Sequence, residues 1–492
     1  MVFNSIDYLI FMAIVATVYY LLPQKVKMAW LALVSLVFYA FFDIKYLIVI
    51  GIVIIVTYAG ARLIEHYKEK GKERICKAIL TIIVILEVGN LATFKYLDFL
   101  VGNINKLISV MGGEGISVLE IAMSVGISFY TFQSLGYVID VYRGKYSAEK
   151  NIIIYTLFVA FFPQICCGPI GRGDKLLPQY RKKIEFDVDV IREGMLTIAY
   201  GIFLKLVIAD NLNAYMAPKI KYYSSQNGMT LLFATMLIGI RIYCDFYGYS
   251  LMARGSGKIL QIELMKNFNQ PYLACSFKEF WRDWHVSLTS WFTDYIYIPL
   301  GGNRKGKARK YINQMIVFGI SGLWHGSAWH YIAWGLLNGL YLVLEDLLGP
   351  ALARLWDRLG VDRTRKAWKA IKWAFVSFFV GIAWLFFEAD SFSSVFDMLI
   401  IMVREFRPGW LFVDACAKSF DSTWQFAVIL ISIIIMTIVD RYEKNGISVI
   451  NLIFRQQLLI RWCIYLLLLF IILCWGAYGE GFSQTQFVYF EF

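Results

Sequence analysis

The side chains in this sequence best suited to acid–base chemistry are histidines. Three of its four histidines, His285, His325 and His330, fall between residues 267 and 346. Residues 311 to 344 are otherwise almost free of charge, and an ionisable side chain at membrane depth usually faces a helix-bundle interior or a wet cavity. Because imidazole exchanges a proton near neutral pH, His325 is our candidate for a general base, with a satisfied core histidine as the alternative. His330 would point about 140° away from His325 on an ideal helix, so we interpret it as structural.

Glycine spacing around His325 predicts close helix packing. Gly322 and Gly326 bracket it four residues apart, and Gly335 and Gly339 repeat the same spacing one segment later. Pairs of small residues at this spacing let the backbone of another helix approach closely. We therefore expect His325 to lie where two backbones come together.

His285 falls in a different pattern. Aromatic and apolar residues recur at three- and four-residue steps from Phe277 to Tyr295, with charged residues in the gaps. This spacing predicts an amphipathic helix at or near the membrane interface. Trp281 and His285 are four residues apart and would share one face of that helix. Residues 299–303, Pro-Leu-Gly-Gly-Asn, then end the helix, and a basic stretch follows.

The elements that must position these residues are membrane helices. Of the 492 residues, 59% are hydrophobic, and the mean hydropathy is +0.58. Several apolar runs could span roughly 30 Å of hydrocarbon, where the backbone must satisfy its own hydrogen bonds as helices. Besides the central stretch, the apolar runs fall at residues 8–22, 28–42, 46–60, 78–93, 96–111, 118–141, 152–165, 195–208, 229–243, 373–387, 395–403, 426–439 and 458–475. The expected fold is an all-α polytopic integral membrane protein of about ten to thirteen membrane helices.

Charge predicts how the chain sits in the membrane. The net charge is +12, and its basic residues gather in short loops such as the predicted loop at residues 62–77. The positive-inside rule places these loops in the cytoplasm and both termini outside, which explains the charge better than nucleic-acid binding. The sequence shows no internal repeat or flexible linker, so we expect one membrane domain over residues 1–492.

Three motifs carry a family resemblance. They are NFNQPY at 267–272, FWRDWHVSLTSWFTDYIYIPLGGNRKG at 280–306 and GLWHG at 322–326. They resemble the membrane-bound O-acyltransferases, and most closely the alginate O-acetyltransferase branch, which acetylates exported bacterial polysaccharides. CGPIGR at 167–172 resembles a further motif of that family, with a simple loop as the alternative. The resemblance implies a bundle with re-entrant or interfacial helices around a central tunnel, and residues 267–346 as its catalytic core.

The resemblance also implies roles for particular residues. His325 would be the catalytic base, and His285 a second catalytic residue that orients or polarises the thioester, with a non-catalytic interfacial histidine as the alternative. The candidate substrate-binding residues are Trp281, Arg282, Asp283, Trp324, Asp245, Asn303 and Arg304. Asp245 could instead form a structural ion pair with Arg241 or Arg254, which we favour. Arg304 and its basic neighbours suit the phosphates of coenzyme A and equally suit a cytoplasmic flank.

The C-terminal tail, residues 478–492, ends in an aromatic run around Tyr489. An interfacial aromatic belt is one interpretation. Related acyl-transfer systems carry a Tyr in a similar tail, so the resemblance implies that Tyr489 relays the acyl group on the outer face.

The resemblance implies acetyl-CoA as donor, a bacterial inner or plasma membrane, and an exported polysaccharide as the final acceptor. It also implies a separate SGNH-type partner enzyme. No Cys/His spacing predicts a metal site, and no G-x-S-x-G nucleophile elbow occurs. Two alternatives remain: D-alanyl transfer to teichoic acid from a carrier-protein thioester, and a transporter of glycan or lipid without chemistry.

Overall fold

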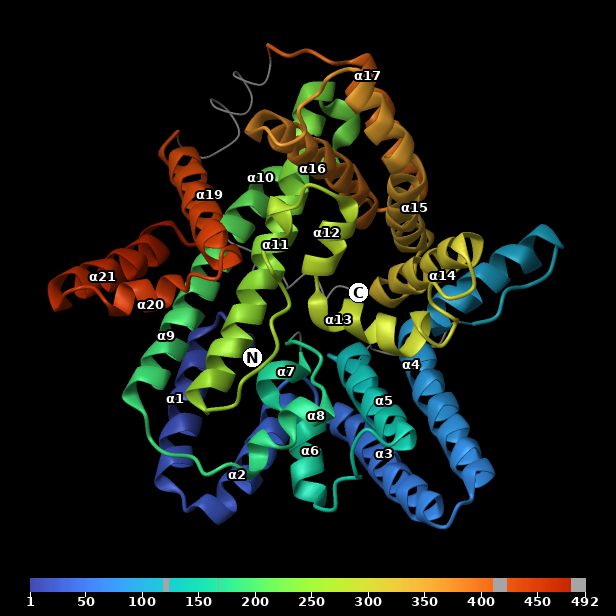
Figure 1. The fold of residues 1–492 in the computed structure, drawn as a ribbon, viewed down its shortest axis with the longest axis vertical. Coiled ribbons are helices and arrows are strands. Elements are labelled where there is room, and N and C mark those ends of the chain that lie inside the picture. The colour runs from blue at the N-terminus through green and yellow to red at the C-terminus, as the bar shows by residue number, and fades with distance from the viewer. Residues whose placement is uncertain (118–123, 167, 410–422, 479–492) are drawn as a thin grey trace. The chain divides into compact units, whose positions relative to one another are not determined.

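The computed structural model describes residues 1–117, 124–166, 168–409 and 423–478, and its regular elements there are all helices (Figure 1). Eight of these described helices are long and apolar enough to cross a membrane. They are α3 (Tyr46–Glu69), α4 (Glu73–Val110), the continuous helix Val188–Lys221, α11 (Gly228–Ile259), α15 (Trp329–Arg358), α16 (Lys366–Glu388), α19 (Thr423–Lys444) and α21 (Leu458–Trp475). Two shorter apolar helices are Ile6–Leu21, which is α1, and Ile152–Ile165. The prediction of an all-α polytopic membrane protein is confirmed.

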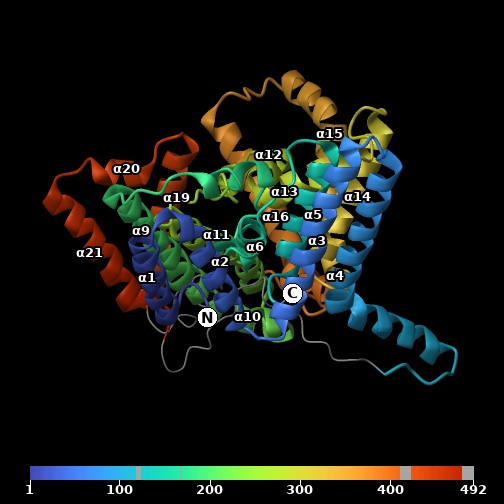
Figure 2. The same ribbon diagram turned by 90° about the horizontal axis from the view of Figure 1, so that it is seen from below.

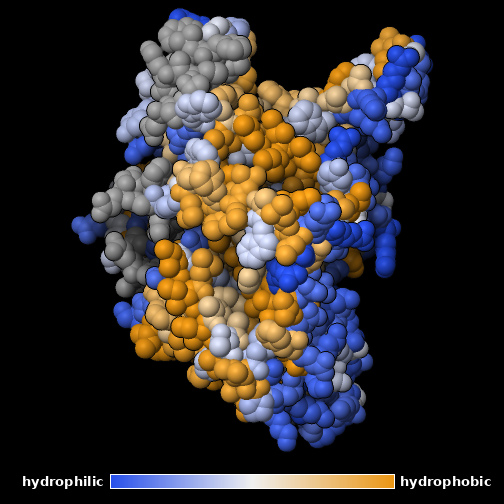
Figure 3. All heavy atoms as spheres, turned by 90° about the vertical axis from the view of Figure 1, so that its left-hand side faces the viewer, coloured by the Kyte–Doolittle hydropathy of each residue, from blue (hydrophilic) through white to orange (hydrophobic). Residues whose placement is uncertain are grey.

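Burial separates lipid-facing helices from core helices. In α21 only 6% of the apolar window is buried, whereas 72% is buried in α11 and in Val188–Lys221. Exposed apolar side chains are costly in water but suit hydrocarbon. On the face drawn in Figure 3 many hydrophobic residues lie at the surface.

Two predicted boundaries are wrong. Residues 78–93 and 96–111 form one helix, α4, because neither Gly nor Pro interrupts the chain between them and the charged Lys95 is buried. The predicted loop at 62–77 is mostly helix, since α3 continues to Glu69 and α4 begins at Glu73. Charged residues are good helix formers, so charge alone does not mark a loop.

The chain separates into two compact units, and the single domain expected from the sequence stays a prediction. The first unit holds residues 1–198 and 250–265. Its remaining helices are α2 (Gln24–Ala40), α5 (Ile127–Arg143), α6 (Ile152–Ala160), α7 (Phe162–Ile165), α8 (Gly173–Leu176) and the start of α9 (Val188–Ile202). Helices α3, α4 and α5 lie side by side, as Figures 1 and 2 both show.

The second unit, residues 199–249 and 266–492, carries the histidines of interest. After α9 it continues through a π-helical turn, Phe203–Ala209, into α10 (Asp210–Lys221). Its other helices are α12 (Phe277–Asp283), α13 (Val286–Phe292), a π-helical turn at Thr293–Tyr297, α14 (Lys307–His325), α17 (Phe392–Arg404) and α20 (Val449–Phe454). Helix α15 packs against both α14 and α16, and Trp284, Trp334 and Trp384 are among the largest fully buried side chains.

Candidate active site

His325 is the last residue of α14, and its side chain is buried with 3% exposure. Gly326 follows in an extended conformation and turns the chain toward α15. A Cβ at Gly322 would meet the backbone of Tyr331 and Ile332, and one at Gly335 would meet the backbone of Phe318 and Gly322. The predicted close approach of two backbones beside His325 is therefore confirmed, and it occurs between α14 and α15.

Three aromatic rings enclose the His325 imidazole. Its ring centroid lies 4.9 Å from Trp324, 4.9 Å from Trp334 and 5.4 Å from Phe387, with interplanar angles of 81°, 84° and 74°. Edge-to-face contacts of this kind are favourable and fix the orientation of each ring. We call His325 with these three rings the aromatic cage. It draws on α14, α15 and α16, so three helices determine where the imidazole lies.

Trp281 borders this cage. Its ring lies 5.6 Å from that of Trp334 and 5.1 Å from that of Phe318. Its indole Nε1–H is buried and has no hydrogen-bond partner among the described residues. A buried Trp N–H usually finds an acceptor, so this one can donate to a bound molecule.

His285 does not lie within a helix as predicted. Helix α12 ends at Asp283 and α13 begins at Val286, with His285 between them in the left-handed conformation, φ 43° and ψ 53°. Trp281 and His285 therefore do not share one helical face. A non-glycine residue in this conformation costs roughly 1–3 kcal/mol and persists only where surrounding contacts enforce it. Such strain concentrates at functional sites.

The His285 ring is buried with 2% exposure. Its centroid lies 4.6 Å from Phe246 of α11 and 6.0 Å from Trp324. Burial lowers the pKa of the imidazole from 6.5 to about 3, so it is neutral at physiological pH. Since Trp324 contacts both imidazoles, the structure brings His285, His325 and Trp324 together, and their catalytic roles stay predictions.

His330 lies on α15, just after the turn that separates α14 from α15. Its Nδ1 lies 2.9 Å from the Phe386 carbonyl oxygen, which it can contact as a hydrogen-bond donor. This bond links α15 to α16 and fits the structural interpretation of His330.

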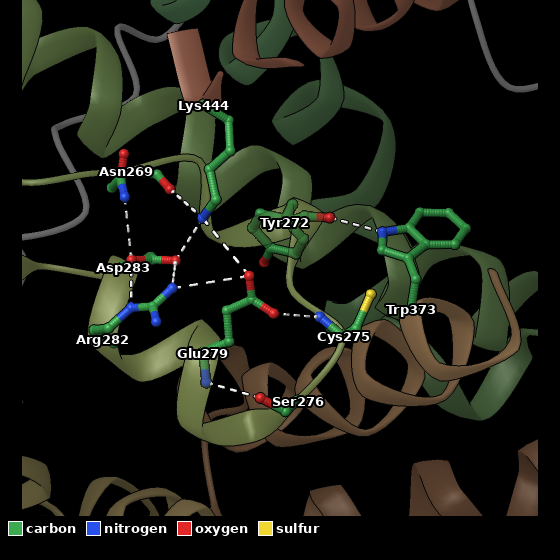
Figure 4. Close-up of polar contacts among 9 residues, drawn as sticks. All are labelled: Asn269, Tyr272, Cys275, Ser276, Glu279, Arg282, Asp283, Trp373 and Lys444. Carbon is green, nitrogen blue, oxygen red and sulfur yellow. Dashed lines mark hydrogen bonds and ion pairs between the residues drawn. The ribbon is translucent and has the colours of Figure 1, made fainter. Parts of the chain in front are cut away.

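Asp283 and Arg282 lie in a dense polar cluster (Figure 4). The buried Asp283 carboxylate accepts two hydrogen bonds from the Arg282 guanidinium, at 3.1 and 3.0 Å, and one from Lys444 Nζ at 2.5 Å. Burial alone would raise the pKa of Asp283, but the hydrogen bonds from Arg282 and Lys444 outweigh it and lower that pKa. A carboxylate held this way is occupied by protein partners. A substrate-binding role for either residue stays a prediction.

Asp245 has a partner that the sequence analysis did not consider. Lys205 Nζ, 1% exposed, lies 2.8 Å from Asp245 Oδ1 and 2.8 Å from Asp210 Oδ1. Arg241, which we expected as a partner, forms an ion pair with Glu388 at 2.9 Å. Lys205 lies in the π-helical turn Phe203–Ala209, and such turns often occur at functional sites.

Asn303 and Arg304 lie on an exposed turn between the π-helical turn and α14. Gly301, Gly302 and Gly306 have positive φ angles of 106°, 55° and 88°, which glycine adopts without strain. Asn313, fully buried on α14, donates to the Gly302 carbonyl oxygen at 2.9 Å and fixes the turn. Arg304 is exposed and available to an anion.

Tyr489 lies outside the described residues. Within the part of the chain that the structure describes, no group of three or more His, Cys, Asp or Glu could hold a metal ion.

Three site residues were not anticipated from the sequence. In a sequence, a lysine such as Lys444 is ordinarily explained as the flank of a helix. A lysine such as Lys205 is ordinarily explained as a solvated charge. Phe387 is one of many apolar residues of α16. Lys205 was the best-signalled of these, because it interrupts the apolar run 195–208.

Comparisons with known proteins show the family of this chain. The model of the membrane-bound O-acyltransferase family matches residues 147–387, which include both buried histidines. The chain belongs to this family, and it is an O-acyltransferase that passes through the membrane several times.

The chain is similar to several O-acetylating relatives over most of its length. The chain is 32% identical over 441 residues to the probable alginate O-acetylase AlgI of Azotobacter vinelandii, an alignment covering 89% of this chain and 84% of the relative. It is 32% identical over 400 residues to the peptidoglycan O-acetyltransferase of Helicobacter pylori, covering 76% and 73%. Similarity to the teichoic acid D-alanyltransferase of Streptococcus thermophilus is lower, 29% over 268 residues, covering 51% and 63%.

Proposed function

We propose that this enzyme transfers an acetyl group from acetyl-CoA, supplied in the cytoplasm of a bacterium, toward a hydroxyl of an exported or cell-surface polysaccharide. The observation that carries the proposal is the pair of buried histidines, His325 and His285, that share the Trp324 ring. The similarity to alginate and peptidoglycan O-acetylating relatives over most of the chain supports acetyl transfer to a polysaccharide.

In this proposal His325 is the general base. Its imidazole takes the proton from the acceptor hydroxyl as the oxygen attacks the thioester carbonyl carbon. A C–O bond forms, the C–S bond breaks, and the proton passes from the imidazole to the sulfur of the departing thiol. Base catalysis by a positioned histidine is worth about 10²–10⁴-fold. The aromatic cage holds the imidazole in place for both proton transfers.

His285 and Trp281 are the proposed hydrogen-bond donors to the carbonyl oxygen of the thioester. Negative charge grows on this oxygen in the transition state, and donors aimed at it supply a large part of catalysis. A neutral imidazole can present a ring N–H, and the pKa of His285 supports the neutral form. The Trp281 Nε1–H is a second donor, since it has no partner among the described residues.

The positions of the basic residues support a route for acetyl-CoA from the cytoplasm. Arg304 and the basic residues that follow it would contact the phosphates of coenzyme A on the cytoplasmic side, at the mouth of a central tunnel. The positive-inside rule supports that side, with both termini on the outer face of an inner or plasma membrane. Tyr489 would accept the acetyl group outside and pass it to a partner enzyme of SGNH type, which completes the transfer.

Isotope labelling tests this function. Purified protein is mixed with radiolabelled acetyl-CoA, and the label is located by peptide mass spectrometry in the wild type, His325→Ala and Tyr489→Phe. His66→Ala is the matched control, because His66 is exposed in α3 and belongs to the first unit. We expect label in the wild type and His66→Ala, and none in His325→Ala. Loss of label in Tyr489→Phe would assign that residue as the acceptor.

Two results would contradict the proposal. Label taken up only from a carrier-protein thioester would favour the D-alanyl-transfer alternative. Polysaccharide export that continues in cells carrying His325→Ala, with acetylation unchanged, would favour a transporter without acyl chemistry.

A further inference from the structure

The strained backbone at His285 is enclosed by a second chain segment. Residues 267–270 run beside residues 283–287 and are joined to them on both sides of His285. Asn269 N donates to the Asp283 carbonyl oxygen at 3.0 Å, and Val286 N donates to the Asn267 carbonyl oxygen at 2.8 Å. Asn267 Oδ1 also accepts from the Ser287 hydroxyl at 2.6 Å. These bonds bracket the left-handed residue and determine its backbone.

The enclosing segment is itself strained. Gln270 has φ 51° and is buried with 4% exposure. Each of the two paired segments therefore has a non-glycine residue in a left-handed conformation at or beside it, and the described residues contain only one more, Gln261. The arrangement needs an attachment that stops the two segments from relaxing apart.

Lys444 provides that attachment (Figure 4). Its ammonium donates at 2.9 Å to the Asn269 carbonyl oxygen, on one segment, and at 2.5 Å to Asp283 Oδ2, on the other. Asn269 Nδ2 completes the connection at 3.3 Å from Asp283 Oδ1. Charge-assisted hydrogen bonds of this kind are about twice as strong as neutral ones.

Arg282 cannot replace Lys444 in this role. It binds the same carboxylate, but it precedes Asp283 in the same helix and so holds only one of the two segments. Its side chain is 66% exposed, against 20% for Lys444. Lys444 reaches the cluster from the end of α19, far away in the sequence.

We propose that Lys444 is a positioning residue that holds His285 in its left-handed conformation, and so keeps the imidazole aimed at the reacting carbonyl. Its link to catalysis rests on the function proposed above. Lys444 does not touch the substrate. It acts through Asp283 and Asn269 on the backbone that carries His285.

The test compares Lys444→Met, which keeps the length of the side chain and removes its charge, with Lys444→Arg, which keeps the charge. Lys145→Met is the matched control, because Lys145 also binds a buried carboxylate, Asp140, at 2.9 Å but lies in the first unit. Hydrogen exchange is followed in peptides covering residues 282–292 of the full-length protein. We expect faster exchange there in Lys444→Met, and wild-type exchange in Lys444→Arg and Lys145→Met.

Kinetics give the second readout. We expect Lys444→Met to lower kcat for acetyl transfer by about 10–100-fold with KM for the donor nearly unchanged, since a misplacement of about 1 Å can cost 10²-fold. Lys444→Arg should recover most of the rate. In a His285→Ala background, Lys444→Met should change the remaining rate less than about twofold, because the two residues act as one unit.

Equal exchange over residues 282–292 in the wild type and Lys444→Met would overturn the inference. So would rate losses that multiply in the double variant, because Lys444 would then act independently of His285. A wild type that transfers no acetyl group refutes the proposed function instead, and the exchange comparison still decides whether Lys444 holds the segment.

Discussion

Replacing Gly335 with Ala should disable the enzyme without touching a catalytic side chain. Gly335 lies on α15 beside Trp334 of the aromatic cage, and it packs against Gly322, one turn before His325 on α14. A Cβ at this position would stand 3.0 Å from Gly322 N and 3.1 Å from Gly322 Cα, and closer still to the Phe318 carbonyl oxygen. All three atoms are backbone, so no side chain can rotate away.

The size of the effect follows from these distances. Non-bonded heavy atoms prefer roughly 3.5–4.0 Å, so α14 and α15 must part by an amount on the order of 1 Å. Overpacking of this kind costs about 1–3 kcal/mol of stability. The same shift moves His325 relative to Trp334, and a displacement of about 1 Å can reduce the rate about 10²-fold. We therefore expect kcat to fall far more than stability alone would explain.

Helix α15 offers its own controls. At Gly349 a Cβ meets nothing within 4 Å, so Gly349→Ala should retain full activity and gain about 0.4–1 kcal/mol of stability from lower unfolded-state entropy. At Gly339 the nearest atoms are Met315 Sδ, which can shift, and Phe318 Cβ, which moves only with its backbone, both at 3.1 Å. Gly339→Ala should therefore give an intermediate loss.

The assay is acetyl transfer by detergent-purified protein, with thermal unfolding measured on the same samples. The expected order of activity is Gly349→Ala, then Gly339→Ala, then Gly335→Ala. A Gly335→Ala enzyme whose kcat stays within about threefold of the wild-type value would refute the reasoning, since the predicted loss is about 10²-fold. The helix crossing would then not position His325.

Three other predictions concern the buried charges and the cage. Lys205→Met removes the buried cation that lies 2.8 Å from both Asp245 and Asp210 and should cost about 3–5 kcal/mol in thermal unfolding. The exposed ion pair of Lys183 should contribute nearly nothing when broken in the same way. The pKa of Asp283 is lowered, so its contribution to stability is present above its unfolded pKa of 3.8 and is lost as the pH falls through its folded pKa. Lys444→Met should therefore shift the midpoint of acid unfolding to higher pH. An unchanged midpoint would count against the ion pair between Lys444 and Asp283. Trp334→Ala should open the cage and raise the rate with butyryl-CoA relative to acetyl-CoA, measured as a ratio of kcat/KM; an unchanged ratio would show that the cage does not select acyl length.

The sequence indicated the membrane class and both buried histidines, because apolar length and isolated ionisable residues are local signals. The glycine spacing also predicted the close crossing at Gly322. The break at His285 could not be predicted, since the local pattern favours one helix and only the contacts with residues 267–270 enforce the left-handed conformation. Tertiary contacts often override local preference in this way.

The partners of the site residues were equally hidden. Phe387 and Lys444 lie 62 and 119 residues beyond His325 in the numbering, and no spacing rule links them to it. Asp245 has two arginines near it in sequence, yet its partner is Lys205, on the helix packed beside it. An ion pair inside a helix bundle is decided by which faces meet, and a single sequence does not encode that choice in any local pattern.

The parts of the site leave the ribosome in a fixed order, and this order has a consequence for assembly in the membrane. The segments that enclose His285 are near neighbours in sequence, so they can close as soon as residue 292 has been synthesised. The cage waits for Phe387, and the bond from Lys444 comes later still. At about 5–20 residues per second, on the order of ten seconds separates the first step from the last. From the synthesis of His325 until that of Lys444 the nascent enzyme would hold both histidines but lack the bond that fixes His285, so a truncation before α19 should insert into the membrane and remain inactive.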